Sequence, residues 1–276
     1  MIFARFLCGA ALCAFATAAG AAAPSLPTGH KAPSLGRVSS SVRLEYTDFS
    51  KLYGDRASLT AESKLGLGQP TRVGVSFSEG QRRGGGSAIR STQGTATVEH
   101  DWSERLSSRT SAGLASNGAV FAKEQFSQDI SYKLGGGLVA TIGGKFASYG
   151  NRNDVATWSA GAAYYLREAT FSYRYSLLAS RRFGRSQAHL ASVRVNDPGG
   201  SGSTQLWVGH GTSLFEVNLP RSANGRFTSV ALQRSQPIAG GLALNIGVNR
   251  AWYRTPTGDY TGTGVVAGLS FADWPF

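Results

Sequence analysis

Apolar and polar side chains alternate with a period of two from about residue 38 to the end of the chain. Val42, Leu44 and Tyr46, for example, are separated by Arg43 and Glu45. This period places successive side chains on opposite faces of a β-strand. The alternation predicts an all-β chain of about 14 strands, whose central residues fall near 40–49, 56–65, 71–79, 92–102, 108–117, 125–134, 138–148, 155–166, 169–178, 187–196, 204–212, 227–236, 242–253 and 260–271.

A soluble β-sandwich would alternate in the same way, so other features must separate the two fold classes. Aromatic residues stand at the ends of many apolar runs, as at Phe77, Trp102, Trp158 and Trp252. Tight connections such as 134–137 alternate with looser, arginine-rich segments. Outer-membrane barrels have aromatic girdles, short periplasmic turns and longer outer loops. We therefore predict a closed antiparallel transmembrane β-barrel in the outer membrane of a Gram-negative cell, with both termini in the periplasm.

The segment 108–117 is the weakest of the predicted strands, because Ala112 and Leu114 alone make up its apolar face. Loss of one hairpin here would give twelve strands, which is the alternative to fourteen. The longer outer loops are expected at 79–90, 117–123, 149–154, 180–186 and 213–226.

The N-terminus has the pattern of a secretory signal peptide. An apolar run over 6–17 follows a basic residue and ends in alanines and a glycine. Cleavage near Ala23 would remove Cys8 and Cys13, the two cysteines of the chain, so no disulfide or cysteine metal site is expected. The predicted organisation is a signal peptide at 1–23, a proline-containing periplasmic linker at 24–37 and an outer-membrane β-barrel at 38–276.

The chain is basic, with 28 Lys and Arg against 16 Asp and Glu among 276 residues. A strongly basic exported protein is expected to meet anionic partners. We expect outer-membrane lipid and lipopolysaccharide, and acidic polysaccharide as a further partner; nucleic acid is not expected outside the cytoplasm. The sequence suggests no cofactor and no metal site.

The C-terminus suggests one more partner, the barrel-assembly machinery. A final Phe after an apolar alternating strand is similar to the signal that this machinery reads. The chain ends in Phe276, but Pro275 interrupts the strand, and Phe271 is the last residue of the alternation. We assign the assembly signal to Phe271 and Phe276.

Four stretches together resemble a known family: 44–49 (LEYTDF), 102–106 (WSERL), 176–182 and 268–271 (GLSF). They look like the YaiO family of outer-membrane β-barrels, over about residues 38 to 276. The resemblance implies the barrel fold and the outer-membrane location. It also implies the link to surface-polysaccharide export that is suspected for similar barrels. It carries over no functional residues.

The candidate enzymatic chemistry is limited to serine and histidine. Outer-membrane lipid hydrolases and deacylases use a Ser–His pair at the barrel rim, and His100, His189 and His210 fall on predicted strands. The chain contains no GxSxG element, and its glycine runs lack the strand–helix context of a phosphate loop. We expect a protein that is not an enzyme, with a rim hydrolase as the third hypothesis.

The charged residues between the apolar positions point into the lumen if the apolar face is outward. Lys133, Lys145, Arg174 and Arg194 form a candidate basic wall, with Asp129 as the inward acid on the same strands. A basic stripe in a narrow pore favours anions. The other interpretation is that these charges pack and stiffen the wall.

The early strands mix the two signs of charge. Arg43, Glu45, Glu62 and Lys64 form a candidate lumen ion-pair network. Arginines of the expected outer loops are candidate contacts to lipid phosphates, because arginine binds phosphate with two parallel hydrogen bonds; they are Arg82, Arg83, Arg181, Arg182 and Arg185.

Two functions therefore remain open besides the hydrolase. The first is a channel for anionic solutes, or one linked to surface-polysaccharide export. The second is a closed structural or binding barrel without transport.

Overall fold

A computed structural model describes residues 37–68, 70–84, 87–149, 154–180, 184–213, 225–255 and 258–275. The predicted signal peptide, the linker up to residue 36, Arg181, Arg182 and Phe276 lie outside these residues. None of the described residues forms a helix long and apolar enough to cross a membrane.

Fourteen antiparallel strands make up the described chain, and all fourteen predicted strand cores fall on them. Their bounds are β1 (Arg37–Phe49), β2 (Gly54–Gly66), β3 (Thr71–Gly84), β4 (Ser87–Asp101), β5 (Leu106–Ala115), β6 (Glu124–Gly135), β7 (Leu138–Ser148), β8 (Asp154–Tyr165), β9 (Ala169–Ser180), β10 (Gly184–Asn196), β11 (Ser203–Ser213), β12 (Gly225–Ala239), β13 (Leu242–Arg254) and β14 (Tyr260–Pro275).

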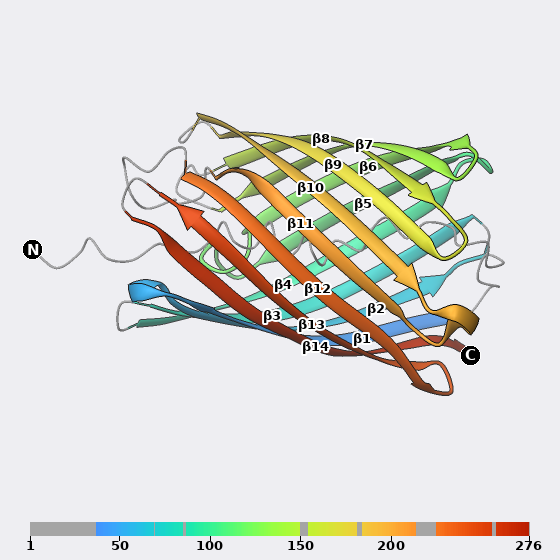
Figure 1. Cartoon of the computed structure of the whole chain (residues 1–276), viewed down its shortest axis with the longest axis horizontal. Helices are drawn as coiled ribbons and strands as arrows, with labels where there is room; N and C mark the ends of the chain where they lie inside the picture. Colours follow the sequence, from blue (N-terminus) through green and yellow to red (C-terminus); the bar gives the residue numbers. More distant parts are fainter. Residues whose placement is uncertain are drawn as a thin grey trace, which may run out of the picture.

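Each strand pairs with its neighbours in sequence, and β1 pairs with β14, so the sheet closes into a barrel. The tilted strands wrap around a cylinder in Figure 1. The strand predicted to be weakest, β5, pairs along its length with both β4 and β6. The prediction of a closed antiparallel barrel is confirmed with fourteen strands, and the twelve-strand alternative is wrong.

The apolar half of each alternation faces outward. Leu114, Ile142 and Trp158 are 63–69% exposed, whereas the residues beside them in sequence point inward and are more buried. A closed barrel satisfies its backbone hydrogen bonds between strands, and its outer side chains meet lipid and not water. The exposed apolar band is therefore the membrane-facing surface.

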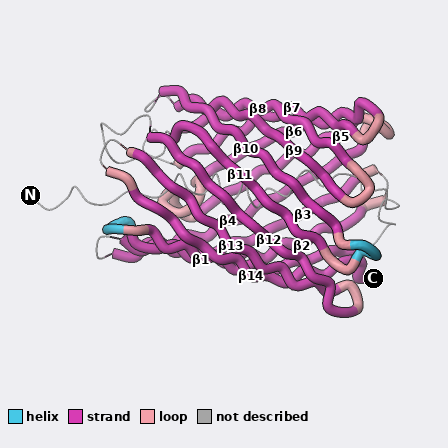
Figure 2. The backbone as a smooth tube through the Cα atoms, viewed as in Figure 1, coloured by secondary structure: helices cyan, strands magenta, loops and turns pink. Residues whose placement is uncertain are grey.

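The two ends of the barrel differ in their connections. We call the end where β1 begins and β14 ends the near end, and the opposite end the far end. Two 3-10 turns mark them, η1 (Lys51–Tyr53) at the far end and η2 (Pro198–Gly200) at the near end (Figure 2). The near-end turns β6–β7 and β12–β13 have two residues each, whereas the far-end β5–β6 connection has eight.

The prediction of a long outer loop at 79–90 is wrong. Strand β3 continues to Gly84 and β4 starts at Ser87, so two residues connect them. Strands β9 and β10 likewise extend into the segment expected as a loop at 180–186. Polar and charged side chains broke the apolar alternation there, but backbone pairing continues past the apolar band, where the strand ends rise above the lipid.

Candidate functional site

The inward side chains change in character along the barrel axis. Toward the near end they are charged, in the middle they are mostly serine and threonine, and toward the far end they are apolar. Together these three layers decide what the lumen can hold.

The near-end charged layer is an ion-pair network on β2 to β5 that is centred on the buried Glu99. This carboxylate lies 3.6 Å from Lys64, 3.3 Å from Arg72 and 3.8 Å from Arg109. Lys64 also lies 3.4 Å from Glu62. The sequence suggested the mixed signs but not Glu99 as the centre, because alternation does not reveal register across four strands.

Arg43 and Glu45, which were expected in the same network, form a separate pair. The Arg43 Nε and the Glu45 Oε1 are 3.0 Å apart on one face of β1. The structure therefore divides the four residues of the expected network into two places, with Glu62 and Lys64 in the near-end layer.

The candidate basic wall does not form one surface. Lys145 and Arg174 line a cavity in the lumen, but Lys133 and Arg194 do not border it. Both lie within two residues of the near-end limit of their strands, Lys133 on β6 and Arg194 on β10. The alternation along each strand correctly predicts that all four side chains lie on the inner face. Their positions along the barrel axis depend on the register between strands, which the alternation does not show.

Arg174 is also compensated by an acid. Its Nη2 lies 3.2 Å from the Asp129 Oδ1, although two strands stand between them. Gly161 on β8 is the register partner of Arg174, and Gly143 on β7 is the partner of Asp129. A Cβ at Gly143 would collide with the Asp129 carboxylate. The glycines leave the room in which the two side chains meet across the sheet.

The middle layer surrounds a lumen cavity of about 340 Å³. Hydroxyl groups line much of it, and several pair across strands, as in Thr60–Ser78 and Thr97–Ser111, each at 2.9 Å. Small hydroxyl side chains satisfy each other without filling the lumen. This layer can therefore hold water or a small polar solute.

The far-end apolar layer lines the inside of β8 to β13. It consists of Val155, Leu178, Ala188 and Phe227, all buried, with Tyr149 and Tyr253 packed against them. Tyr253 also stacks on Tyr260 at 4.5 Å, and Tyr260 stacks on Tyr53 at 4.1 Å. An apolar lining on the inside is the reverse of the pattern expected for a wet lumen.

The β5–β6 connection adds further apolar side chains to the inside of the barrel, and we call it the inserted loop (116–123). Val120 and Phe121 are only 1% and 4% exposed, and Phe121 borders the 340 Å³ cavity. A Cβ added at Gly80 on the inner face of β3 would lie 2.7 Å from both side chains. The segment 117–123 was expected as an outer loop, but its apolar residues are buried inside the barrel.

Hydrogen bonds fix the inserted loop to the wall. The Ser91 hydroxyl donates to the Asn117 carbonyl at 3.1 Å, and the Asn117 Nδ2 donates to the Arg90 carbonyl at 2.7 Å. On the other side, a Cβ at Gly118 would collide with the Tyr149 carbonyl. The loop thus lies between β4 and Tyr149 and narrows the lumen.

Arg56 is the charged residue that lies among these apolar side chains. It is 8% exposed, and its Nε has no hydrogen-bond partner among the described residues. It borders the 340 Å³ cavity and also a second one of about 110 Å³. Arg82, its register partner on β3, lies on the same inner face.

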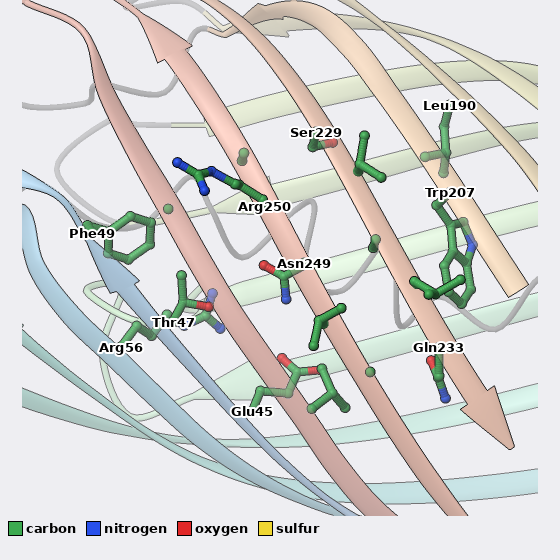
Figure 3. A pocket seen from close by; sticks show the side chains of 18 of the residues that line it. Glu45, Thr47, Phe49, Arg56, Leu190, Trp207, Ser229, Gln233, Asn249 and Arg250 are labelled. Carbon is green, nitrogen blue, oxygen red and sulfur yellow. The ribbon is translucent and has the colours of Figure 1, made fainter. Parts of the chain in front are cut away.

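The second cavity has two unlike sides (Figure 3). Phe49 and Arg56 lie on one side and Trp207 and Leu190 on the other, with Asn249 between them. Glu45 borders both cavities too, but it is engaged by Arg43. Among the described residues no carboxylate forms an ion pair with Arg56. A guanidinium removed from water without such a partner is costly, so an anion entering this site would gain from it.

Sequence comparison decides the family. The model of the YaiO membrane β-barrel domain matches residues 38–216, which contain β1 to β11. The chain belongs to the YaiO membrane β-barrel family.

The fold of this YaiO-family barrel is similar to that of solved outer-membrane β-barrels. The CymD monoaromatic hydrocarbon channel is 8% identical, with a TM-score of 0.63 over 87% of this chain and 89% of that one. An anion-selective porin from Comamonas acidovorans is 11% identical, with a TM-score of 0.47 over 85% of this chain and 98% of that one. At such identities the likeness concerns the fold alone, and the second one is too loose to support any argument.

The remaining candidate residues of the YaiO-family barrel lie outside the lumen or near its rim. Arg83 and Arg185 lie on the outer face of β3 and β10 and are exposed, whereas Arg82 faces inward. Phe271 lies on the outer face of β14 and is 37% exposed. Of the five expected phosphate contacts, Arg181 and Arg182 lie outside the described residues.

The three strand histidines hydrogen-bond threonine or tyrosine hydroxyls. His100 pairs with Thr71 at 2.9 Å, and His189 pairs with Tyr173 at 2.7 Å. His210 pairs with Thr228 at 3.0 Å, also on the outer face. Within the described residues, no group of three His, Cys, Asp or Glu side chains is placed to hold a metal ion.

Proposed function

We propose that this YaiO-family barrel is an outer-membrane channel for small anionic solutes, and that Arg56 binds their anionic group inside the lumen. The observation that carries the proposal is the burial of Arg56 between two cavities with an unpartnered Nε. A carboxylate or phosphate would supply the charge-assisted hydrogen bond that the Arg56 Nε lacks among the described residues.

The size of the cavities favours a small solute over a polymer. Ligand pockets are roughly 300–1,000 Å³, and the two lumen cavities measure about 340 and 110 Å³. The inserted loop narrows the lumen further. We therefore favour permeation of small anions over a path for a polysaccharide chain, which the family resemblance alone suggests.

The side facing Arg56 favours solutes with an apolar part. Trp207 is buried on the inner face of β11, and Leu190 lies beside it in the same cavity. A site with a few polar groups on an apolar wall is typical of small-molecule recognition. An organic acid would place its carboxylate at Arg56 and its apolar part against Trp207.

The proposed orientation places the near end in the periplasm and the far end at the cell surface. The near-end connections have two to six residues, whereas the far-end ones range from two between β3 and β4 to eight or more. This difference supports the placement, since outer-membrane barrels keep their short turns in the periplasm. The proposed activity is not enzymatic. Within the described residues the hydrogen-bond partners of the strand histidines are threonine and tyrosine hydroxyls and not the serine that the rim-hydrolase hypothesis requires.

The far-end apolar layer favours a second function, a closed barrel that binds a solute or only stabilises the membrane. Its buried side chains and the inserted loop would need to move before a solute could pass. Such a barrel would keep Arg56 as an internal binding site without transport.

Conductance across a planar bilayer separates the two functions. We expect the folded native barrel to conduct and to prefer anions, as measured by the reversal potential in a salt gradient. The variant R56Q should lose most of this preference. The matched control K133Q removes one inward positive charge that borders neither cavity, and it should leave the preference nearly unchanged.

Two results would overturn the channel. Absence of conductance in correctly folded and inserted protein would favour the closed barrel. An equal loss of anion preference in R56Q and K133Q would mean that overall charge, and not the Arg56 site, sets selectivity.

A further inference from the structure

The outer face of β10 to β13 contains a continuous polar row near the far end. His189, His210, Thr228 and Trp252 are register partners on four successive strands. His210 bonds Thr228 at 3.0 Å. Polar groups with a tryptophan at this height mark the membrane interface, where lipid headgroups begin.

Three arginines lie on the outer face around this row, and we call them the outer arginine cluster: Arg226, Arg250 and Arg254. Arg226 and Arg254 are direct register partners on β12 and β13, and both are exposed. The guanidinium of Arg250 lies 5.6 Å from the centre of the Trp252 ring. Among the described residues, none of the three forms an ion pair with an acid.

The strands around the cluster contain no neutralising charge. Strands β10, β11, β12 and β13 have no Asp or Glu in their sequences. On β2 and β3 the outer face near the far end carries both signs, because Arg83 on β3 is the register partner of Asp55 on β2, and Glu79 also lies on this face. On β10 to β13, by contrast, every charged residue of the strands is positive.

An apolar surface adjoins the cluster on the membrane side. Val208 and Val230 are register partners one step below the polar row, and Arg250 is the partner of Val230. Val248 is 54% exposed on the same face. A ligand that contacts both areas must combine anionic groups with acyl chains.

We propose that the outer arginine cluster binds the phosphate groups of lipid A, with its acyl chains against Val208, Val230 and Val248. Arginine binds phosphate with two parallel hydrogen bonds and can stack on an aromatic ring at the same time. The assignment to lipid A rests on the proposed orientation, which places the far end in the outer leaflet. It does not depend on transport through the lumen.

The test measures lipid bound by the purified full-length mature barrel in detergent, by native mass spectrometry. The probes are lipid A, dephosphorylated lipid A and phosphatidylglycerol. We expect lipid A to bind best and the variant R226Q/R254Q to bind it about tenfold more weakly, since charge-assisted hydrogen bonds are lost. The variant R83Q/R90Q removes two exposed far-end arginines from another sector, on β3 and β4, and should bind as the native protein does.

The retention of the folded barrel in each variant is checked by its altered gel mobility without boiling. If R226Q/R254Q does not fold, R226K/R254K replaces it; this variant keeps the charge but loses the paired hydrogen bonds, and it should bind lipid A measurably more weakly. Equal weakening in R83Q/R90Q would overturn the site. Equal binding of phosphatidylglycerol or of dephosphorylated lipid A would also overturn it.

Discussion

At the near end of the lumen, Glu99 lies within 3.8 Å of three cationic side chains on neighbouring strands. At the far end, Leu178 and Phe227 are buried in an apolar layer on the opposite side of the barrel. Both arrangements fill space inside a closed sheet, but one uses charge on β2 to β5 and the other apolar packing on β8 to β13. The comparison shows that the two halves of this barrel are stabilised by different forces.

The difference has consequences for function as well. Ion pairs in a wet lumen are screened by salt, whereas apolar packing is not. The charged layer is polar, whereas the apolar layer and the inserted loop narrow the lumen. Arg56 lies among the apolar side chains near the far end and borders both cavities, which is why we place the selective step of permeation there.

The largest effect is expected from E99Q. The substitution keeps the shape of the side chain but leaves Lys64, Arg72 and Arg109 without their shared carboxylate. Removing one partner from such a network costs about 3 kcal/mol of unfolding free energy. Urea unfolding in lipid or detergent measures it, and E104Q in the exposed β4–β5 turn is the control. Equal stabilities of the two variants would mean that the network contributes little.

The next prediction concerns closure at the far end. In G80V, the new side chain would overlap Phe121 and Val120, since a Cβ alone lies 2.7 Å from each. The inserted loop should then move out of the lumen and raise single-channel conductance severalfold. The control G94V adds the same side chain at a glycine whose Cβ would meet nothing within 4 Å. Unchanged conductance in G80V would place the constriction elsewhere.

A smaller effect is expected in the middle of the lumen from D129N. Arg174 would lose its partner at 3.2 Å, and about 1 kcal/mol of stability with it, because both side chains are partly exposed. The freed guanidinium should shift the reversal potential toward stronger anion preference. The double variant R174Q/D129N should return the selectivity to near the native value. A shift of the D129N reversal potential toward cation preference would contradict this prediction.

The smallest effect belongs to the near-end β10–β11 turn. Hydrogen bonds from Arg234 hold the pKa of the Asp197 carboxyl below its usual range. A lowered folded-state pKa means that this contact stabilises the turn at neutral pH and is lost as pH falls through the folded pKa. Limited proteolysis of the turn should therefore accelerate in acid. The cleavage rate of D197N should no longer change as the pH falls from neutral through the folded-state pKa of Asp197.

The fold could be predicted from the sequence because the alternation along each strand shows which of its side chains face outward. Alternation identified even the poorly apolar β5, and Ala112 and Leu114 do lie on its outer face. The predicted strand ends failed at 79–90, since charged residues such as Arg82 and Arg83 break the apolar pattern without breaking backbone pairing.

The candidate site could be predicted only in part. Inward parity identified Lys145 and Arg174, but it could not show that Arg174 reaches Asp129 over Gly143 and Gly161. Arg56 was missed altogether. Its inward position follows from the alternation with the outward residues Ala57 and Leu59 on β2. That it has no ion pair among the described residues depends on strands far away in the sequence.

The sequence by itself therefore determined the fold class and the face to which each strand side chain points, and it left fourteen or twelve strands for the structure to decide. These follow from a period of two along a single strand, which is a local property. Only the tertiary structure decided the heights at which inward side chains meet, the folding of 116–123 into the lumen and the isolation of Arg56. The physical reason is that register between strands and the closure of β1 on β14 bring together residues that no local pattern relates.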